Sequence, residues 1–117
     1  MSAEPRTLAD AGRLLKSREL TAEAITEGCL ARITERNRSL NAFITVLVDE
    51  ARAQAKEADE EIAVGRYRGP LHGVPISIKD IIDMRNAPTT AASRVREAKP
   101  GKFEPRDVIE RLERFAI

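Results

Sequence analysis

Lys79 is the residue whose type and neighbours point most directly to chemistry. It lies in the run Ile76-Ser-Ile-Lys-Asp-Ile-Ile82, directly after the turn-rich stretch Gly69-Pro-Leu-His-Gly-Val-Pro75. A lysine desolvated among isoleucines loses affinity for its proton and can act as a base near neutral pH. Lysine bases paired with serine nucleophiles are a known variant of triad chemistry. Two ordinary interpretations stay open from the residues alone: Lys79 on the solvated face of a half-exposed strand, or Lys79 paired with Asp80.

The serines offer few partners for this lysine. Ser77 precedes Lys79 by two residues, so a strand would place both side chains on one face and allow a local Ser-Lys pair. No oxyanion site or second serine accompanies that pair. Ser93 is interpreted as a loop residue, and no serine of the chain stands in a Gly-Ser-Ser-Gly setting.

The remaining candidate side chains favour structural roles. His72 is the only histidine and has no Asp or Cys partner in motif spacing, so it is predicted to pack in the loop near the strand. Cys29, the only cysteine, falls on an apolar helix face and is predicted to be a small core residue. One cysteine forms no internal disulfide, and no metal cluster is predicted. Asp80 is predicted to bind local backbone N–H groups or to balance the charge of Lys79.

Three helices are predicted to precede and position this segment. Thr7 and Thr21 are good N-caps, and a third helix is predicted over residues 49–64, with Gly65 as its stop. Apolar residues at helical spacing define the inward faces. In the three helices these are Leu8, Ala11, Leu14 and Leu15; Ala22, Ile25, Cys29 and Ile33; and Ala51, Ala55, Ala58 and Ile62.

The remaining segments alternate between extended chain, loop and helix. Residues 42–47 are predicted to form a short strand or extended segment, and residues 76–82 a strand that is largely buried near its end. Small residues over 87–94 indicate a loop. A last helix is predicted over about residues 106–115, with Val108, Ile109, Leu112 and Phe115 inward.

Composition narrows the functional classes. The net charge is +1, which gives no electrostatic case for a nucleic-acid or membrane partner. The N-terminus has no apolar run, and no stretch approaches the ~18 apolar residues of a membrane span, so a cytoplasmic setting is expected. Leu, Ile, Val and Phe together number 28 of 117 residues, which predicts a thin core.

Several runs in this order resemble the amidase signature family. The run Gly69-Pro-Leu-His-Gly-Val-Pro-Ile-Ser-Ile-Lys-Asp80 resembles the family's lysine segment, and Pro88-Thr-Thr-Ala-Ala-Ser93 is similar to the loop that follows it. Upstream, Ser17-Arg-Glu-Leu-Thr-Ala-Glu23, Cys29-Leu-Ala-Arg-Ile33 and Asn41-Ala-Phe-Ile44 fit the family's N-terminal helices and strand. The resemblance covers about residues 7–117.

The resemblance implies an α/β fold in which helices cover a mixed sheet. This chain would supply one partial amidase domain over 1–117, with a helical part at about 7–64, the lysine segment at 69–94 and the final helix at about 106–115. The sheet would be incomplete. Two departures put the local loop geometry in doubt: Ile81 stands where the family often has Asn, and Ala92 where it often has Gly, and losing a glycine can strain a turn that needs φ > 0.

The resemblance also implies an activity. The family hydrolyses carboxylic amide C–N bonds with a serine, a second serine next to a cis peptide bond, and a lysine that matches Lys79. Both serines lie in a Gly/Ser-rich region downstream of the lysine, which this sequence lacks, so the chain alone is expected to be inactive. The implied partners are a small-molecule amide and the remainder of the amidase domain; no cofactor or metal is implied. The alternatives are a non-enzymatic interaction module, one half of a split amidase, or a helical domain with an accidental match.

Overall fold

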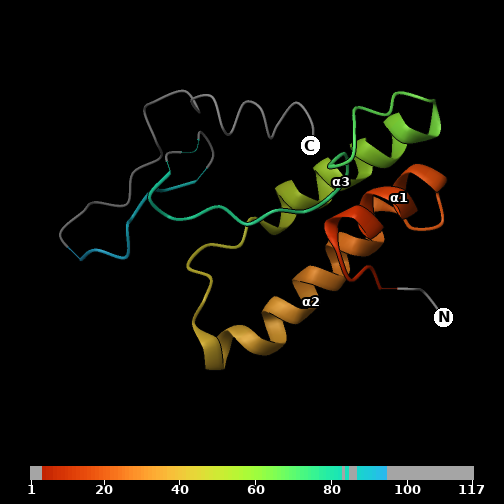
Figure 1. Cartoon of the computed structure of the whole chain (residues 1–117). Helices are drawn as coiled ribbons and strands as arrows, with labels where there is room; N and C mark the ends of the chain where they lie inside the picture. Colours follow the sequence, from red (N-terminus) through yellow and green to blue (C-terminus); the bar gives the residue numbers. More distant parts are fainter. Residues whose placement is uncertain (1–3, 83, 85–86, 95–117) are drawn as a thin grey trace.

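The computed structural model describes residues 4–82, 84 and 87–94, and the regular structure in these ranges is helical. Helix α1 spans Leu8–Ser17, α2 spans Ala22–Leu40 and α3 spans Val48–Ala63. Helix α3 lies beside α1 and the beginning of α2, whereas the far half of α2 extends away from the other two helices (Figure 1). The predicted final helix at 106–115 lies outside the described residues.

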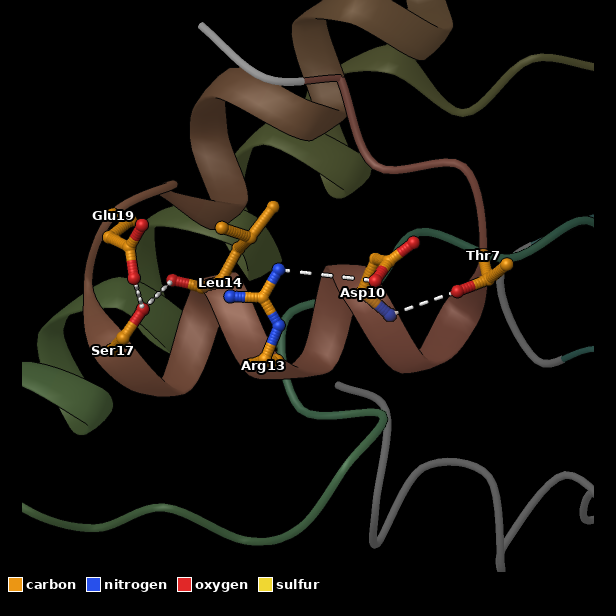
Figure 2. Close-up of polar contacts among 6 residues, drawn as sticks. All are labelled: Thr7, Asp10, Arg13, Leu14, Ser17 and Glu19. Atoms are coloured by element: carbon orange, nitrogen blue, oxygen red, sulfur yellow. Dashed lines mark hydrogen bonds and ion pairs between the residues drawn. The ribbon is translucent and has the colours of Figure 1, made fainter.

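The first two helices begin at the predicted threonines. The Thr7 hydroxyl oxygen accepts a hydrogen bond from the backbone N–H of Asp10 at 3.1 Å, as Figure 2 shows. The Thr21 hydroxyl oxygen accepts one from the N–H of Ala24, also at 3.1 Å. Both contacts satisfy a donor that the first turn of a helix leaves without a partner, which confirms the two predicted starts.

Helix α1 ends sharply at a left-handed residue. Arg18 has a φ of 62°, and its N–H and those of the next two residues turn back to carbonyl oxygens of the last turn. The Ser17 hydroxyl lies 3.2 Å from the Leu14 carbonyl oxygen and 2.7 Å from a carboxylate oxygen of Glu19 (Figure 2). These contacts satisfy the end of the helix and direct the chain immediately into α2.

Helix α2 receives a second cap from a distant part of the chain. The carboxylate of Asp59, in α3, accepts hydrogen bonds from the N–H groups of Ala22 at 2.7 Å and Glu23 at 3.0 Å. A negative charge at a helix N-terminus also interacts favourably with the helix dipole. Asp59 therefore fixes the start of α2 against α3 across 37 residues of sequence.

The core is small and built largely from alanine. The predicted inward stripe of α3 is confirmed at Ala55, Ala58 and Ile62, which are buried, whereas Ala51 is half-buried. In α1 the prediction for Leu8 is wrong: its side chain is 62% exposed, because the core begins one turn later, at Ala11. The buried core cluster consists of Ala11, Leu15, Ala22, Ala55, Ala58, Ile62 and Val74, with Ile25 and Tyr67 packed against it.

The predicted stripe of α2 is buried only at its beginning. Of the predicted residues Ala22 is buried, whereas Ile25, Cys29 and Ile33 are half-buried; Thr26, which is outside the predicted stripe, is also buried. The reason is the direction of the helix, whose second half leaves the core (Figure 1).

The 69–74 loop completes the core at the junction of the three helices. A Cβ added to Gly12 of α1 would lie 2.4 Å from the carbonyl oxygen of Pro70, and one added to Gly73 would lie 2.9 Å from the Cβ of Ala22. Gly73 also has a φ of +81°, which glycine adopts most readily. Both glycines are thus required for the close approach of the loop to α1 and α2.

The strand predicted over 76–82 is not formed in this structure, and residues 42–47, predicted as a short strand or extended segment, do not form a strand. Residues 42–47 are irregular, and the Asn37 side-chain amide replaces a strand partner there: it accepts from the N–H of Phe43 at 2.8 Å and donates to its carbonyl at 3.0 Å. Residues 76–79 are irregular and 80–82 form a turn. Among the described residues the pairing is one antiparallel bridge between Met84 and Ala87. A strand needs a neighbour to bind its backbone, and these ranges supply none to 76–82.

Candidate active site

Lys79 lies on an exposed, irregular stretch that leaves the packed loop. The chain is buried at Val74, in the core cluster, and exposed five residues later at Lys79. The Lys79 ammonium group has no hydrogen bond or ion pair within the part of the chain that the structure describes. Of the interpretations open from the sequence, the geometry matches a solvated lysine.

Three of the four isoleucines near Lys79 face solvent as well, whereas Ile78 is half-buried. Ile76 is 40% exposed, Ile81 60% and Ile82 39%. The desolvation expected of a lysine among isoleucines is therefore not present in this arrangement. These side chains instead form an uncovered apolar stretch on both sides of the lysine.

Asp80 is bound by the loop that follows it rather than by Lys79. Its carboxylate accepts hydrogen bonds from the Thr90 N–H at 2.9 Å, from the Thr90 hydroxyl, and from the Ala92 N–H at 3.3 Å. Its backbone carbonyl accepts a further one from the N–H of Ala91 at 2.9 Å. Asp80, Thr90, Ala91 and Ala92 are referred to below as the Asp80 cluster.

These donors stabilise the charged form of Asp80. The Thr90 hydroxyl, followed by the Thr90 backbone N–H, lowers the pKa of the Asp80 carboxyl below its usual value, with smaller contributions from the N–H groups of Ala92 and Ala91. The sequence allowed either a backbone-binding or a charge-balancing role for this residue. The structure shows the first, and Thr90, the residue that supplies most of the contacts, was missed because nothing in the local pattern links positions ten apart.

The cluster holds two alanines in left-handed conformation. Ala91 has a φ of 50° and Ala92 a φ of 52°. Such a conformation is unfavourable for an L-residue with a Cβ. The strain expected at Ala92 from the loss of a glycine is thus present in the structure, and it extends to Ala91.

His72 anchors the base of the lysine segment. Its side chain is fully buried, and its Nδ1 accepts a hydrogen bond from the backbone N–H of Arg68 at 3.1 Å. A neutral ring that accepts at Nδ1 carries its proton on Nε2, which lies 3.0 Å from a carboxylate oxygen of Glu61. The 3.3 Å approach of the Arg68 Nε to Nε2 is therefore not a hydrogen bond in this tautomer.

The surroundings of His72 favour its neutral form. Burial lowers the pKa of the imidazole and the nearby Arg68 charge lowers it further, while Glu61 and Asp59 act in the opposite direction. The prediction that His72 packs in the loop is confirmed. Its polar partners in α3 were not evident from the sequence, because they come from a different element.

The structure does not bring the other candidate residues, Ser77, Ser93 and Cys29, together into one site. Ser77 and Ser93 are exposed, and the Ser93 N–H donates to the Thr90 carbonyl at 2.9 Å. Cys29 is half-buried on α2 rather than in the core. Within the described residues no cluster of three or more His, Cys, Asp or Glu side chains is arranged to hold a metal ion. None of the helices described is long and apolar enough to cross a membrane.

A groove also lies between α2 and the start of α3. Its walls include Leu30, Ile33, Val46 and Val48, with the ion pair of Glu27 and Arg52 at one side. The lining residues do not include any from the 69–94 segment, so this groove is separate from Lys79.

Comparison with known proteins identifies the family. The Amidase family model matches residues 24–115, a range that contains Lys79 and the whole Asp80 cluster. The chain belongs to the amidase family. The resemblance expected from the lysine segment is thereby confirmed.

Amidase relatives are similar over most of the chain. An amidase from Pseudomonas putida is 42% identical over 91 residues, which is 78% of this chain and 19% of that protein. A glutamyl-tRNA(Gln) amidotransferase subunit from Anaeromyxobacter dehalogenans (strain 2CP-C) is 41% identical over 108 residues, or 91% of this chain and 21% of that protein. The chain thus spans about a fifth of the length of the curated relatives it matches.

Proposed function

We propose that this chain supplies the lysine base of an amide C–N hydrolase. The observation that carries the proposal is the family match over 24–115, which includes the Lys79 segment. The nucleophilic serine and the second serine of the proposed triad would come from residues outside these 117, because none of the chain's five serines stands in a Gly-Ser-Ser-Gly setting. The chain by itself would then not hydrolyse amides.

In the proposed reaction the neutral amine of Lys79 removes a proton from the second serine. That serine takes the proton of the nucleophilic serine, whose oxygen attacks the amide carbonyl carbon. Backbone N–H groups near the nucleophile stabilise the negative oxygen of the tetrahedral intermediate. The C–N bond breaks as the amine leaves with a proton, and water then releases the acyl group as a carboxylic acid.

The proposed fold of the complete domain would cover the exposed lysine segment. The irregular residues 76–79 would join a mixed sheet as a strand that ends at the turn of residues 80–82, with the helices of this chain beside it. The exposure of Ile76, Ile81 and Ile82 supports this, because each would gain favourable burial in such a sheet. Covering Lys79 would also favour its neutral amine, the form that a base requires.

The proposed substrate class is a small carboxylic amide. The relatives named above are an amidase and one component of a glutamyl-tRNA(Gln) amidotransferase, so the amide group is the chemistry that their names share. A free amide and the side-chain amide of glutamine both fit this class.

A chimera tests the proposal directly. Residues 24–115 replace the matching segment of the Pseudomonas putida amidase, with which the chain is 42% identical. The chimera is expected to hydrolyse amides. Lys79→Ala is expected to lower kcat by about a hundredfold or more, the size of a general-base contribution.

Lys56→Ala is the matched control, because Lys56 is an exposed lysine of α3 whose Nζ lies 4.0 Å from a carboxylate oxygen of the exposed Glu60. It is expected to leave kcat unchanged. A folded, active chimera that tolerates Lys79→Ala as well as Lys56→Ala would contradict the role of Lys79.

A second candidate function is that of one half of a split amidase or an interaction module. The uncovered apolar stretch around Lys79 favours it, because irregular, exposed apolar chain can pair with a partner sheet. Native mass spectrometry of the chain mixed with a polypeptide comprising the remainder of the Pseudomonas putida amidase tests it. A 1:1 complex with amide hydrolysis supports a split enzyme, a complex without hydrolysis supports an interaction module, and two separate species contradict both.

A further inference from the structure

We propose that Asp80 is a positioning residue that acts on Lys79 through the hydrogen bonds of the Asp80 cluster. It neither donates nor removes a proton in the reaction. Its role is to hold the backbone at Lys79, so that the lysine side chain extends from a defined position. This inference rests on the proposed function, in which Lys79 is the base.

The contacts of the cluster converge on the residue next to Lys79. Three donors reach the Asp80 carboxylate and a fourth reaches its backbone carbonyl, all from residues 90–92. The carbonyl of Lys79 is bound too, because it accepts the N–H of Ile82 at 3.1 Å. The carbonyl groups of two consecutive peptide bonds, 79–80 and 80–81, are therefore held.

Thr90 is the central donor of this arrangement. Its N–H and its hydroxyl bind the two different oxygens of the carboxylate. Its hydroxyl oxygen also accepts from the Ala92 N–H at 3.2 Å, and its carbonyl accepts from the N–H of Ser93. Thr90 thus connects the carboxylate to the turn that contains the two left-handed alanines.

The cluster takes the place of a strand partner for this stretch. The helices and the 69–74 loop hold the chain only up to Val74, and residues 76–79 are irregular. The next fixed point along the backbone is Asp80. Because hydrogen bonds to a charged acceptor are stronger than neutral ones, the ionised carboxylate is the strongest local restraint on the direction of Lys79.

Nuclear magnetic resonance of the ¹⁵N-labelled chain tests the inference without requiring catalysis. The variants are Asp80→Asn, Thr90→Val and Thr90→Ser, with Asp10→Asn as a control that removes the same charge at an exposed carboxylate. The first measurement is amide hydrogen exchange at Ala91, whose acceptor, the Asp80 backbone carbonyl, is present in every variant. The second is the ¹⁵N relaxation of the Lys79 amide as the pH is lowered.

Asp80→Asn and Thr90→Val are expected to reduce the exchange protection of Ala91 by about tenfold, as the loss of a charge-assisted hydrogen bond implies. Thr90→Ser keeps the hydroxyl and is expected to stay within about twofold of the parent chain, as is Asp10→Asn. The Lys79 amide is expected to become more mobile on acidification, with a midpoint below the ordinary carboxyl pKa of Asp. That step disappears in Asp80→Asn and remains in Asp10→Asn.

Two results would overturn the inference. One is a Lys79 amide that keeps its relaxation rates in Thr90→Val at neutral pH while Ala91 loses protection. The other is an acid step that Lys79 shares with the amides of α1–α3, which would report unfolding of the whole chain. The chimera keeps the proposed function separate: if Lys79→Ala leaves its kcat unchanged, the function fails whatever the exchange data show. If Lys79→Ala abolishes activity but Thr90→Val lowers neither protection nor kcat, the positioning role fails alone.

Discussion

The 69–74 loop and the 76–94 segment are neighbours in the chain but are held by different kinds of interaction. The loop lies between helices, with His72 fully buried, Pro70 against Gly12 of α1 and Gly73 against Ala22 of α2. The segment beyond it carries three exposed isoleucines and Lys79, and the hydrogen bonds of Asp80 join it to residues 90–92 of the same segment. Packing therefore positions the 69–74 loop, while hydrogen bonds between residues close in sequence position the chain around Asp80.

This difference matters for how each region responds to change. A tightly packed loop transmits a new atom or a lost one to the helices around it. A segment held by its own hydrogen bonds can be altered with little effect on the helices, because few apolar contacts join the two. Substitutions matched in chemistry but placed in the two regions measure how separate they are.

The largest effect is expected from truncating a core leucine. Leu15 is 1% exposed at the centre of the core cluster, so Leu15→Ala is expected to lower the free energy of unfolding by about 2–5 kcal/mol. Ile81 is 60% exposed, and Ile81→Ala is expected to change the free energy of unfolding by less than about 0.5 kcal/mol. Urea denaturation followed by circular dichroism measures both. Equal losses would show that the lysine segment is packed as firmly as the loop.

Two glycines in helices give a sharper test of the loop contact. Gly12→Ala places a Cβ against the Pro70 carbonyl and is expected to destabilise the fold by about 1–3 kcal/mol, as overpacking does. A Cβ on Gly28 of α2 meets nothing within 4 Å, so Gly28→Ala is expected to stabilise by up to about 1 kcal/mol through helix propensity. Thermal unfolding of the two variants compares them. A stabilising Gly12→Ala would mean that the loop does not approach α1 so closely.

The smallest effect on stability is expected from protonating the His72 imidazole in the 69–74 loop. Because the folded-state pKa of His72 is lowered, its contribution to stability is complete above the unfolded-state pKa of about 6.5 and is lost as the pH falls toward the lower folded-state pKa. His72 is the only histidine, so no other side chain ordinarily titrates between about pH 5.5 and 7.5. The thermal midpoint is expected to fall as the pH is lowered over that range.

His72→Gln supplies the control for this measurement. It removes the titrating group, so its thermal midpoint is expected to be lower at about pH 7.5 and nearly independent of pH over the same range. A parallel decline in the parent chain and in His72→Gln would assign the pH dependence to other groups.

Local signals in the sequence were sufficient to predict the helices. Thr7 and Thr21 bond within three residues of themselves, and the alanine stripe of α3 repeats at helical spacing, so short windows of sequence contain the information. The prediction for Leu8 was wrong because periodicity gives the direction of a face but not where the neighbouring elements begin to cover it. The same lack of information applies to Cys29 near the middle of α2.

The lysine segment shows what the sequence alone does not determine. Alternating residues over 76–79 indicate a strand, but a strand forms only where another backbone binds it. The resemblance of the motif identified the family and gave Lys79 as the candidate base, since motif spacing is a property of the sequence itself. The partners of Asp80 and His72 depend on which distant residues the fold brings to them, and spacing does not encode that.

The cap that Asp59 provides for α2 has a consequence for the order of events during synthesis. The two N–H groups that it binds belong to residues 22 and 23, which are synthesised well before their acceptor. At about 5–20 residues per second, the delay for 37 residues is about 2–7 s. During that interval the Thr21 hydroxyl is the side-chain acceptor available to the free N–H groups at the start of α2. A fragment that ends between residues 40 and 59 would therefore have a frayed start of α2, because it contains the Thr21 cap but not the Asp59 carboxylate.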